Sequence, residues 1–313
     1  MKLVAPDYYK KFKCIADKCK HSCCIGWEID VDDDTLAYYN SISGEFGERL
    51  RSSIDTDGET AHFCLEENDR CPFLNEKGLC DIITELGEQA LCQICDDHPR
   101  YRNFYSDSEE IGVGMSCEAA AMLILSHQDK TQLETLCDAD EILWEEETEF
   151  IKIRGKLWNM LQNREKTVDS RIKDALGYCG IAENTASLRQ WVSVYRGLER
   201  LDSVWDTVLD ALENADENNL VLPQFQWLEI AFEQLIVYFT YRHLADSLDD
   251  GRFVARMQFA VQSYRMIKYI AALHFAHNGS IDIGILAEIA RIYSAEIEYS
   301  TDNIEALLDI FEK

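Results

Sequence analysis

The sequence predicts a mainly α protein in which a cysteine-rich N-terminal region with irregular loops is packed on a C-terminal helical bundle. Two observations predict this class. Ten of the twelve cysteines in the 313-residue chain precede Ser126, and apolar residues recur at helical spacing after Ser116. Strands and helices do not alternate along the sequence, so a doubly wound nucleotide-binding sheet is not expected. We therefore expect two domains, residues 1–125 and residues 126–313.

Several helices are expected in the second domain, because apolar residues there recur every three or four positions. The acidic stretch that holds Glu141, Glu145, Glu146, Glu147 and Glu149 is interpreted as a solvated helix face. A long amphipathic helix, straight or bent, is expected from Leu188 to Leu212 with Asn184 or Thr185 as its N-cap. Pro223 is expected to open another helix. Further helices are expected over residues 118–126, 253–276 and 281–299.

Charge and hydropathy exclude two classes of partner. The 58 Asp and Glu residues outnumber the 30 Lys and Arg residues, and a formal charge of −28 repels a phosphate backbone. No apolar run follows the charges of residues 1–13, so no secretory signal is expected. Residues 225–248 are apolar but interrupted by charges, which favours a buried helix over a membrane span. We expect a cytoplasmic protein with neither a nucleic acid nor a membrane partner.

The first cysteine group places four thiols, Cys14, Cys19, Cys23 and Cys24, within eleven residues. Thiols of a cytosolic protein are kept reduced, so metal binding is favoured over disulfides. Soft thiolates select zinc or iron–sulfur clusters. Neighbouring side chains diverge in most backbone conformations, so one of Cys23 and Cys24 is expected to bind while the other packs, serves a second centre or bridges the domain.

The second group consists of Cys71, Cys80, Cys92 and Cys95, with Cys117 further along the chain. Together the two groups would fill two four-ligand centres, or one centre with additional structural cysteines. Their irregular spacing favours an iron–sulfur cluster over zinc, which remains the alternative. Cys64 lies without a paired neighbour and is expected to be a bystander.

At these residues the chain resembles the CxxxCxxCC metal-chelating proteins, and more closely the FliB-type flagellin lysine N-methylases. The resemblance is carried by residues 8–12, by CIADKCKHSCCIGWEI from Cys14, by CPFL and GLC between Cys71 and Cys80, and by LCQICDDHPR from Leu91. It covers about the first 120 residues. The spacings x4 and x3 within the first group depart from the family's x3 and x2.

The resemblance implies a cytoplasmic methyltransferase that moves methyl groups from S-adenosylmethionine to lysine side chains of flagellin and contains a [4Fe-4S] cluster. By position, it implies the ligand candidates Cys14, Cys19, Cys23, Cys24, Cys71, Cys80, Cys92 and Cys95, with Cys117 in reserve. The sequence itself holds no glycine-rich loop typical of a methyl-donor site.

Methyl transfer to lysine requires a neutral amine, so aromatic walls and a proton acceptor are sought near the cysteines. Trp27, Glu28, Tyr101 and Tyr105 are the candidates, and each also has an ordinary interpretation as core, surface or loop residue. His98 and Arg100 are expected to hydrogen-bond cluster sulfides or grip a carboxylate, with His98 as a direct ligand the alternative.

A different class of function fits the same cysteines. The chain would then be a non-catalytic iron–sulfur or zinc-binding protein that docks a partner protein or transfers electrons, or a zinc-stabilised scaffold. Light absorption would separate iron–sulfur from zinc, and mass spectrometry of flagellin would test methylation.

Overall fold

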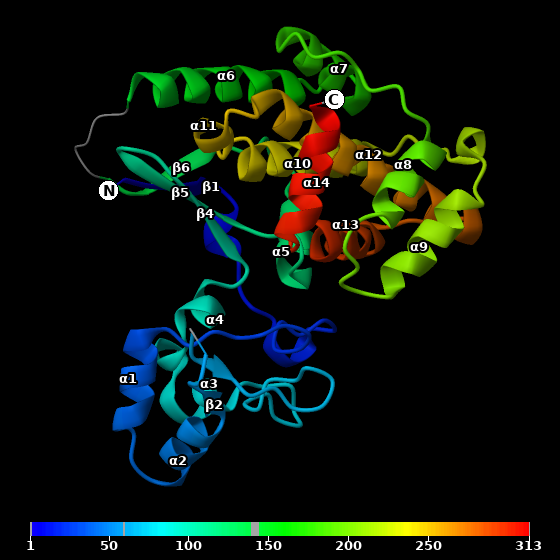
Figure 1. Cartoon of the computed structure of the whole chain (residues 1–313). Coiled ribbons are helices and arrows are strands. Elements are labelled where there is room, and N and C mark those ends of the chain that lie inside the picture. The colour runs from blue at the N-terminus through cyan, green and yellow to red at the C-terminus, as the bar shows by residue number, and fades with distance from the viewer. Residues whose placement is uncertain (1, 59, 139–143, 313) are drawn as a thin grey trace. The chain divides into compact units, whose positions relative to one another are not determined.

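The computed structural model describes residues 2–58, 60–138 and 144–312, and the chain divides into two compact units (Figure 1). The cysteine unit is Lys13–Arg100, and the helical unit is Met1–Phe12 together with Tyr101–Lys313. These units are divided at other residues than the predicted domains 1–125 and 126–313, because the first strand pairs with strands of the helical unit. No described helix combines the length and the apolar character needed to cross a membrane.

A four-stranded mixed sheet belongs to the helical unit, and its order is β4-β5-β1-β6. The strands are β1 (Lys2–Pro6), β4 (Arg100–Phe104), β5 (Ser108–Val113) and β6 (Leu133–Cys137). Strand β1 is parallel to β5, with Val4 opposite Glu110, and antiparallel to β6, with Ala5 opposite Glu134. Gly112 of β5 lies against the Tyr101 ring, with which any β-carbon would collide. This sheet was not predicted, because irregular loops were expected for the N-terminal region.

The remainder of the helical unit is built from helices. They are α5 (Glu118–Leu125), α6 (Glu145–Leu161), α7 (Val168–Tyr178), α8 (Leu188–Arg196), α9 (Val204–Glu213), α10 (Gln226–His243), α11 (Ser247–Asp250), α12 (Phe253–Asn278), α13 (Ile283–Ile297) and α14 (Thr301–Phe311), with the short 3-10 helices η1 (Tyr9–Lys11) and η4 (Glu217–Asn219). The fold is thus mainly α, as the sequence predicted.

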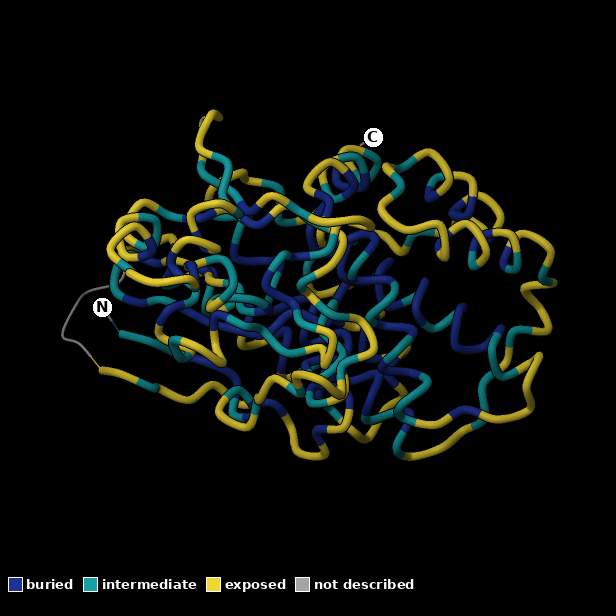
Figure 2. Tube along the Cα trace, turned by 90° about the horizontal axis from the view of Figure 1, so that it is seen from below, coloured by how far each residue is buried: buried dark blue, intermediate teal, exposed yellow. Residues whose placement is uncertain are grey.

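Helices α10 and α12 form the centre of this unit. Residues on all sides of both helices are buried, which is typical of helices surrounded by other elements. Figure 2 shows the buried parts of the chain in dark blue. Helices α5, α6 and α7 contact α10, and α9, α13 and α14 contact α12. The hydroxyls of Tyr195 and Tyr293 meet at 2.9 Å inside this core.

Buried charges of the helical unit have partners within the same unit. Arg154 of α6 forms a bidentate ion pair with Glu110 of β5, and both side chains are at most 5% exposed. Glu233 of α10 is fully buried and accepts from Arg164 at 2.8 Å and Arg171 at 2.5 Å. Each pair satisfies polar atoms that would otherwise be costly to bury.

The cysteine unit contains only short elements. They are α1 (Asp33–Ser41), α2 (Glu45–Ser52), α3 (Asp81–Leu86), α4 (Gln93–Asp97), the two-stranded pair β2 (Ile54–Asp55) and β3 (His62–Phe63), and the 3-10 helices η2 (Ala16–Lys18) and η3 (Glu88–Ala90). Tyr39, Phe63 and Phe73 lie at the centre of its core and are at most 1% exposed. The Tyr39 hydroxyl donates to the carbonyl oxygen of Ala90 at 2.7 Å and so ties α1 to η3.

Most predicted helices are confirmed, among them α5, α6, α12 and α13, although Glu141 lies outside the described residues. The single helix expected from Leu188 to Leu212 is wrong, because the chain leaves the helix between α8 and α9. There the buried Glu296 carboxylate accepts from the N–H groups of Leu201 at 3.2 Å and Asp202 at 2.9 Å. This tertiary contact replaces the hydrogen bonds that a continuous helix would make.

Two predicted helix starts also differ from the structure. Ser187, rather than Asn184 or Thr185, caps α8, since its hydroxyl accepts from the Gln190 N–H in a capping box. Pro223 lies in the loop before α10, which begins at Gln226.

Candidate metal centre

A tight turn brings Cys71 and Cys80 together. Asn75 closes the turn, because its N–H donates to the carbonyl oxygen of Leu79 and its side-chain oxygen accepts from Lys77 and Leu79 N–H groups at 3.0 Å. Gly78 adopts a φ of +73°, a conformation that favours glycine. The sequence between the two cysteines therefore forms the turn that places both of them in one core.

The first cysteine group is attached to this turn by main-chain hydrogen bonds. The Cys71 N–H donates to the carbonyl oxygen of Cys24 at 2.9 Å, and the Gly26 N–H donates to Asp69 at 3.0 Å. Arg70 stabilises the other side of the turn by donating to the carbonyl oxygens of Leu74 and Asn75. Cys24 thus lies beside Cys71, although 46 positions separate them in the printed sequence.

Two of the cysteines lie at helix starts. Cys80 is the N-cap of α3 and Cys92 is the N-cap of α4. Main-chain N–H groups near their sulfurs act to lower the thiol pKa values: those of Ile82 and Ile83 act on Cys80, and that of Cys95 acts on Cys92. The Phe73 N–H acts on Cys71 in the same way. Hydrogen bonds of this kind favour thiolates and tune sulfur-bound metals.

Five cysteines share one core. Cys71 and Cys92 are at most 5% exposed, and Cys24, Cys80 and Cys95 are half-buried against the same apolar cluster. Burial raises the pKa of Cys71 to about 12, with further contributions from the neighbouring Cys24, Cys80 and Cys92 thiolates. Burial likewise raises the pKa of Cys80.

Hydrogen bonds between thiols shift the remaining pKa values. A hydrogen bond from Cys23 lowers the pKa of Cys24 to about 7, against the effect of burial. The hydrogen bond between Cys95 and Cys92 lowers the pKa of Cys92 and raises that of Cys95, which burial raises further. The thiols oppose one another's ionisation, so a bound cation would allow all of them to ionise.

A preformed site for a single ion is not found. Across residues 2–58, 60–138 and 144–312, no three His, Cys, Asp or Glu side chains are placed to hold a metal ion. The predicted metal binding is therefore not confirmed. A [4Fe-4S] cluster binds one thiolate at each iron, so its ligands surround the cluster instead of converging on one point. The five-thiol donor set, with N–H groups directed at three of its sulfurs, fits that group.

The other predicted ligands lie outside this five-thiol group. Cys14 and Cys23 are exposed and Cys19 is half-buried. The Cys14 sulfur accepts from the Ala16 N–H at 3.4 Å, and the Cys19 thiol donates to the His21 carbonyl oxygen at 3.3 Å. Cys117 belongs to the helical unit, where it is the N-cap of α5. Its role as a ligand stays a prediction.

The residues expected to support the cluster lie after α4. The His98 ring packs beside Trp27 at a centroid distance of 5.7 Å. Burial, together with the Arg100 charge, lowers the pKa of His98 to about 4, so its imidazole is neutral. Arg100 donates to the carbonyl oxygen of Asp96 at 2.7 Å. Glu28 is exposed. These contacts leave the predicted roles of His98, Arg100 and Glu28 untested.

The two tyrosine candidates belong to the helical unit. Tyr105 is 5% exposed, and its hydroxyl meets Glu110 and Arg154 at 3.1 Å each. The Tyr101 hydroxyl is buried without a hydrogen-bond partner among the described residues, and the Arg242 guanidinium lies 4.9 Å from its ring centroid. Burial raises the pKa of both tyrosines, so both hydroxyls are protonated at neutral pH.

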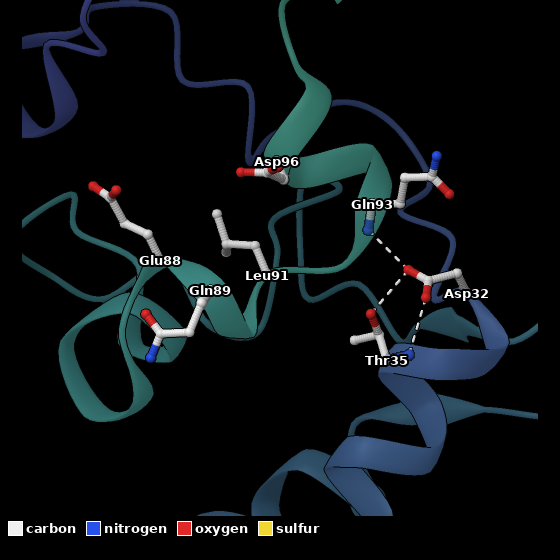
Figure 3. A pocket seen from close by; sticks show the side chains of 7 residues that line it. All are labelled: Asp32, Thr35, Glu88, Gln89, Leu91, Gln93 and Asp96. Carbon is white, nitrogen blue, oxygen red and sulfur yellow. Dashed lines mark hydrogen bonds between the residues drawn. The ribbon is translucent and has the colours of Figure 1, made fainter. Parts of the chain in front are cut away.

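A pocket of about 340 Å³ that sequence reasoning missed is lined in part by Leu91 and Gln93, the residues on either side of Cys92 in the sequence. Figure 3 shows Asp32 on one side, bonded to Thr35 and Gln93, with Glu88 and Gln89 opposite. Its lining is Asp32, Thr35, Glu88, Gln89, Leu91, Gln93 and Asp96. Hydrogen bonds from Gln93 and Thr35 outweigh burial and lower the pKa of Asp32, so this pocket favours cations. Asp32 could have been recognised in the sequence as the N-cap of a helix, because an aspartate three residues before Thr35 is typical of a helix start.

A cysteine-centred unit in the same chain as a helical unit built on α10 and α12 defines a cysteine-cluster protein with a helical C-terminal domain. Residues 157–313, half of the chain, match the FliB lysine N-methylase C-terminal domain, and the chain therefore belongs to the FliB lysine N-methylase family.

Individual relatives match a shorter part. The chain is 25% identical over 141 residues to the lysine-N-methylase of Salmonella typhimurium strain LT2, covering 41% of this chain and 33% of that protein. The same identity and length relate it to the flagellar biosynthetic protein FliU of Salmonella muenchen, of which 79% is covered. The chain thus spans about a third of the length of the lysine-N-methylase relative. No solved structure matches.

Proposed function

We propose that this protein is an S-adenosylmethionine-dependent protein lysine N-methyltransferase that acts on flagellin in the cytoplasm. The match of residues 157–313 to the FliB lysine N-methylase C-terminal domain carries the proposal. Relatives named lysine-N-methylase and flagellar biosynthetic protein FliU support lysine as the acceptor and a flagellar protein as the substrate.

The reaction forms a bond between a lysine nitrogen and the methyl carbon while the bond from that carbon to the sulfonium sulfur breaks. The attacking amine is neutral, and the product ammonium loses a proton to water or to a base. Glu28 is proposed as that base, since its carboxylate is exposed. Tyr101 and Tyr105 of the helical unit, whose hydroxyls are protonated, are the alternative candidates for contact with the amine.

We further propose that the cysteines hold a [4Fe-4S] cluster. Cys24, Cys71, Cys80, Cys92 and Cys95 are the core of the proposed ligand set, with Cys14, Cys19, Cys23 and Cys117 as further candidates. The cluster would supply positive charge that keeps several buried thiols ionised together. The chain's part is to direct N–H groups at the sulfurs and to exclude water from Cys71 and Cys92.

Incubation of the anaerobically purified protein with flagellin and S-adenosylmethionine tests the proposal. Mass spectrometry is expected to find flagellin lysines heavier by one or more methyl groups. Omission of S-adenosylmethionine is the control. If no lysine gains mass while the protein keeps its metal, the methyltransferase proposal fails.

A second function is favoured by the shared core of five thiols. In that case the protein is a non-catalytic iron–sulfur or zinc protein that docks a partner protein or transfers electrons. Visible absorption with stoichiometric iron supports the cluster, and a colourless protein with stoichiometric zinc supports the zinc alternative. A protein that carries its metal but does not methylate flagellin would favour this second function.

A further inference from the structure

Strand β6 forms one edge of the sheet in the helical unit. All of its residues except Leu136 are exposed. The strand at the opposite edge, β4, differs, because its Asn103 is buried and donates to the carbonyl oxygen of Tyr241 in α10 at 3.2 Å. Among the described strands, β6 pairs with β1 alone. An edge of this kind is a template for another extended chain.

The register with β1 determines which main-chain groups of β6 point to the open side. The Asp7 N–H donates to the carbonyl oxygen of Gln132 at 2.9 Å, so these two residues form a hydrogen-bonded pair. Hydrogen-bonded and non-hydrogen-bonded pairs alternate along an antiparallel ladder. The following pairs are Pro6 with Leu133, Ala5 with Glu134 and Val4 with Thr135. Leu133 and Thr135 therefore direct their N–H and C=O groups away from β1.

An irregularity limits the open edge. The register shifts between Leu3 and Val4, which leaves Leu136 as an extra residue between Thr135 and Cys137. A bulge of this type bends the strand and ends regular pairing. The regular edge consequently ends at Thr135. It offers the outward N–H and C=O groups of two residues, Leu133 and Thr135.

The charge at this edge selects the kind of partner. Glu134 and Asp138 are exposed, and Lys10 lies 3.3 Å from the Glu134 carboxylate. The whole chain carries 58 acidic and 30 basic residues. Lys10 neutralises Glu134, so it is the acidic balance of the whole chain that repels an acidic segment and attracts a segment with lysine side chains.

We propose that β6 binds an extended, lysine-bearing segment of the substrate protein, which joins the sheet as a further strand through Leu133 and Thr135. The inference rests on the proposed function and describes how that substrate is held. Main-chain hydrogen bonds supply affinity that depends little on the bound sequence, and successive side chains alternate between the two faces. One strand would thereby accept several different lysine sites.

Two substitutions at Thr135 separate main-chain from side-chain binding. Thr135→Pro removes the outward N–H and leaves the ladder to β1 unchanged, since proline is tolerated where its nitrogen faces solvent. Thr135→Ala removes the side chain but keeps the N–H. With flagellin as the probe in calorimetric titration, Thr135→Pro is expected to weaken binding at least about tenfold, and Thr135→Ala less than about twofold.

Hydrogen exchange of the unmodified protein provides a second measurement that does not depend on a variant folding. Flagellin is expected to slow exchange at the amides of Leu133 and Thr135. Unchanged exchange at both amides, or equal affinity of Thr135→Pro and Thr135→Ala, overturns the edge site. Pairing of two copies of this chain through β6, seen as a dimer that flagellin does not dissociate, also overturns it.

The outcomes for the edge and for catalysis are distinguishable. If flagellin is methylated equally by Thr135→Pro and by the unmodified protein, the edge proposal fails and the proposed function stands. If flagellin slows exchange at β6 but gains no methyl groups, the edge proposal stands and the proposed function fails. If flagellin neither binds nor gains methyl groups, both fail.

Discussion

The helical unit and the cysteine unit reach folded cores by different means. The helical unit surrounds α10 and α12 with other helices and neutralises buried carboxylates with its own arginines, as Arg154 does for Glu110. None of the described helices in the cysteine unit exceeds nine residues, and its core includes the thiols of Cys71 and Cys92. Helices this short are only marginally stable in water unless other contacts hold them. The helical unit thus carries its own counter-charges, whereas the cysteine unit would take stability from the metal that we propose for its thiols.

Removal of metal is expected to have the largest effect and to act on the cysteine unit alone. Binding of metal by structural thiolates contributes on the order of 10 kcal/mol. After chelation of the anaerobically purified protein, amides of Lys13–Arg100 are expected to exchange rapidly, while those of α10 and α12 stay protected. Hydrogen exchange followed by mass spectrometry measures both regions at once.

Cysteine variants provide the matched control for this experiment. Cys71→Ser is expected to lower the metal content, whereas Cys179→Ser, at a half-buried cysteine of the helical unit, is expected to leave it unchanged. Equal loss of protection in both units after chelation would contradict the distinction drawn between them.

A broken buried ion pair is expected to be the next largest effect, now in the helical unit. Arg154→Met leaves the Glu110 carboxylate buried without its cation, which costs about 3–5 kcal/mol. Lys166→Met removes an exposed pair with Asp174 and is expected to cost at most about 1 kcal/mol. Urea unfolding measures both. The double variant Arg154→Met/Glu110→Gln is expected to recover part of the loss, and no recovery would show that packing rather than charge dominates.

Acid is expected to weaken the helical unit through His243. Burial lowers the pKa of His243, and its Nε2 lies 2.6 Å from Glu298, whose own pKa the Arg242 charge lowers against the effect of burial. The unfolded state therefore binds the additional proton, and stability falls as pH drops below about 6.5. The slope from this one group is at most about 1.4 kcal/mol per pH unit.

Comparison of the unmodified protein with His243→Gln isolates that slope. Chemical denaturation at about pH 7 and about pH 5 is expected to show a smaller loss of stability in the variant. Identical pH dependence in the two proteins would mean that His243 is protonated in the folded state.

The sequence was informative where local rules decide the outcome. Helical spacing predicted α12 and α13, and the thiol-rich segments located the metal-binding candidates. Contacts between distant residues decided the rest. The break between α8 and α9 depends on Glu296, which lies far along the chain, and β1 became a strand because it pairs with β5 and β6.

At the candidate site, too, local sequence patterns predicted some features and contacts between distant residues decided the others. The cysteines of the second group were recognisable from spacing, but their neighbours were not. Which five thiols share a core depends on the main-chain bond between Cys71 and Cys24 and on the turn closed by Asn75. The pocket at Asp32 was not predicted, because a single carboxylate does not stand out in a sequence with 58 acidic residues.

The smallest expected difference concerns two aspartate N-caps, one in each unit. Asp282 accepts from the Ile285 N–H at 2.9 Å and stabilises the start of α13 only. Asp32 accepts from the Thr35 N–H and hydroxyl at 2.9 Å and also from the Gln93 N–H at 2.8 Å, so it joins α1 to α4. Asp282→Ala is expected to cost about 1 kcal/mol, and Asp32→Ala about 2 kcal/mol.

Local hydrogen exchange at α1, α4 and α13 distinguishes the two caps. Asp32→Ala is expected to speed exchange in both α1 and α4, because one carboxylate holds both helix starts. Asp282→Ala is expected to speed exchange in α13 alone. If α4 is unaffected by Asp32→Ala, then the Cys92 and Cys95 segment is held by its thiols independently of α1, and the stability of the cysteine unit depends still more on what those thiols bind.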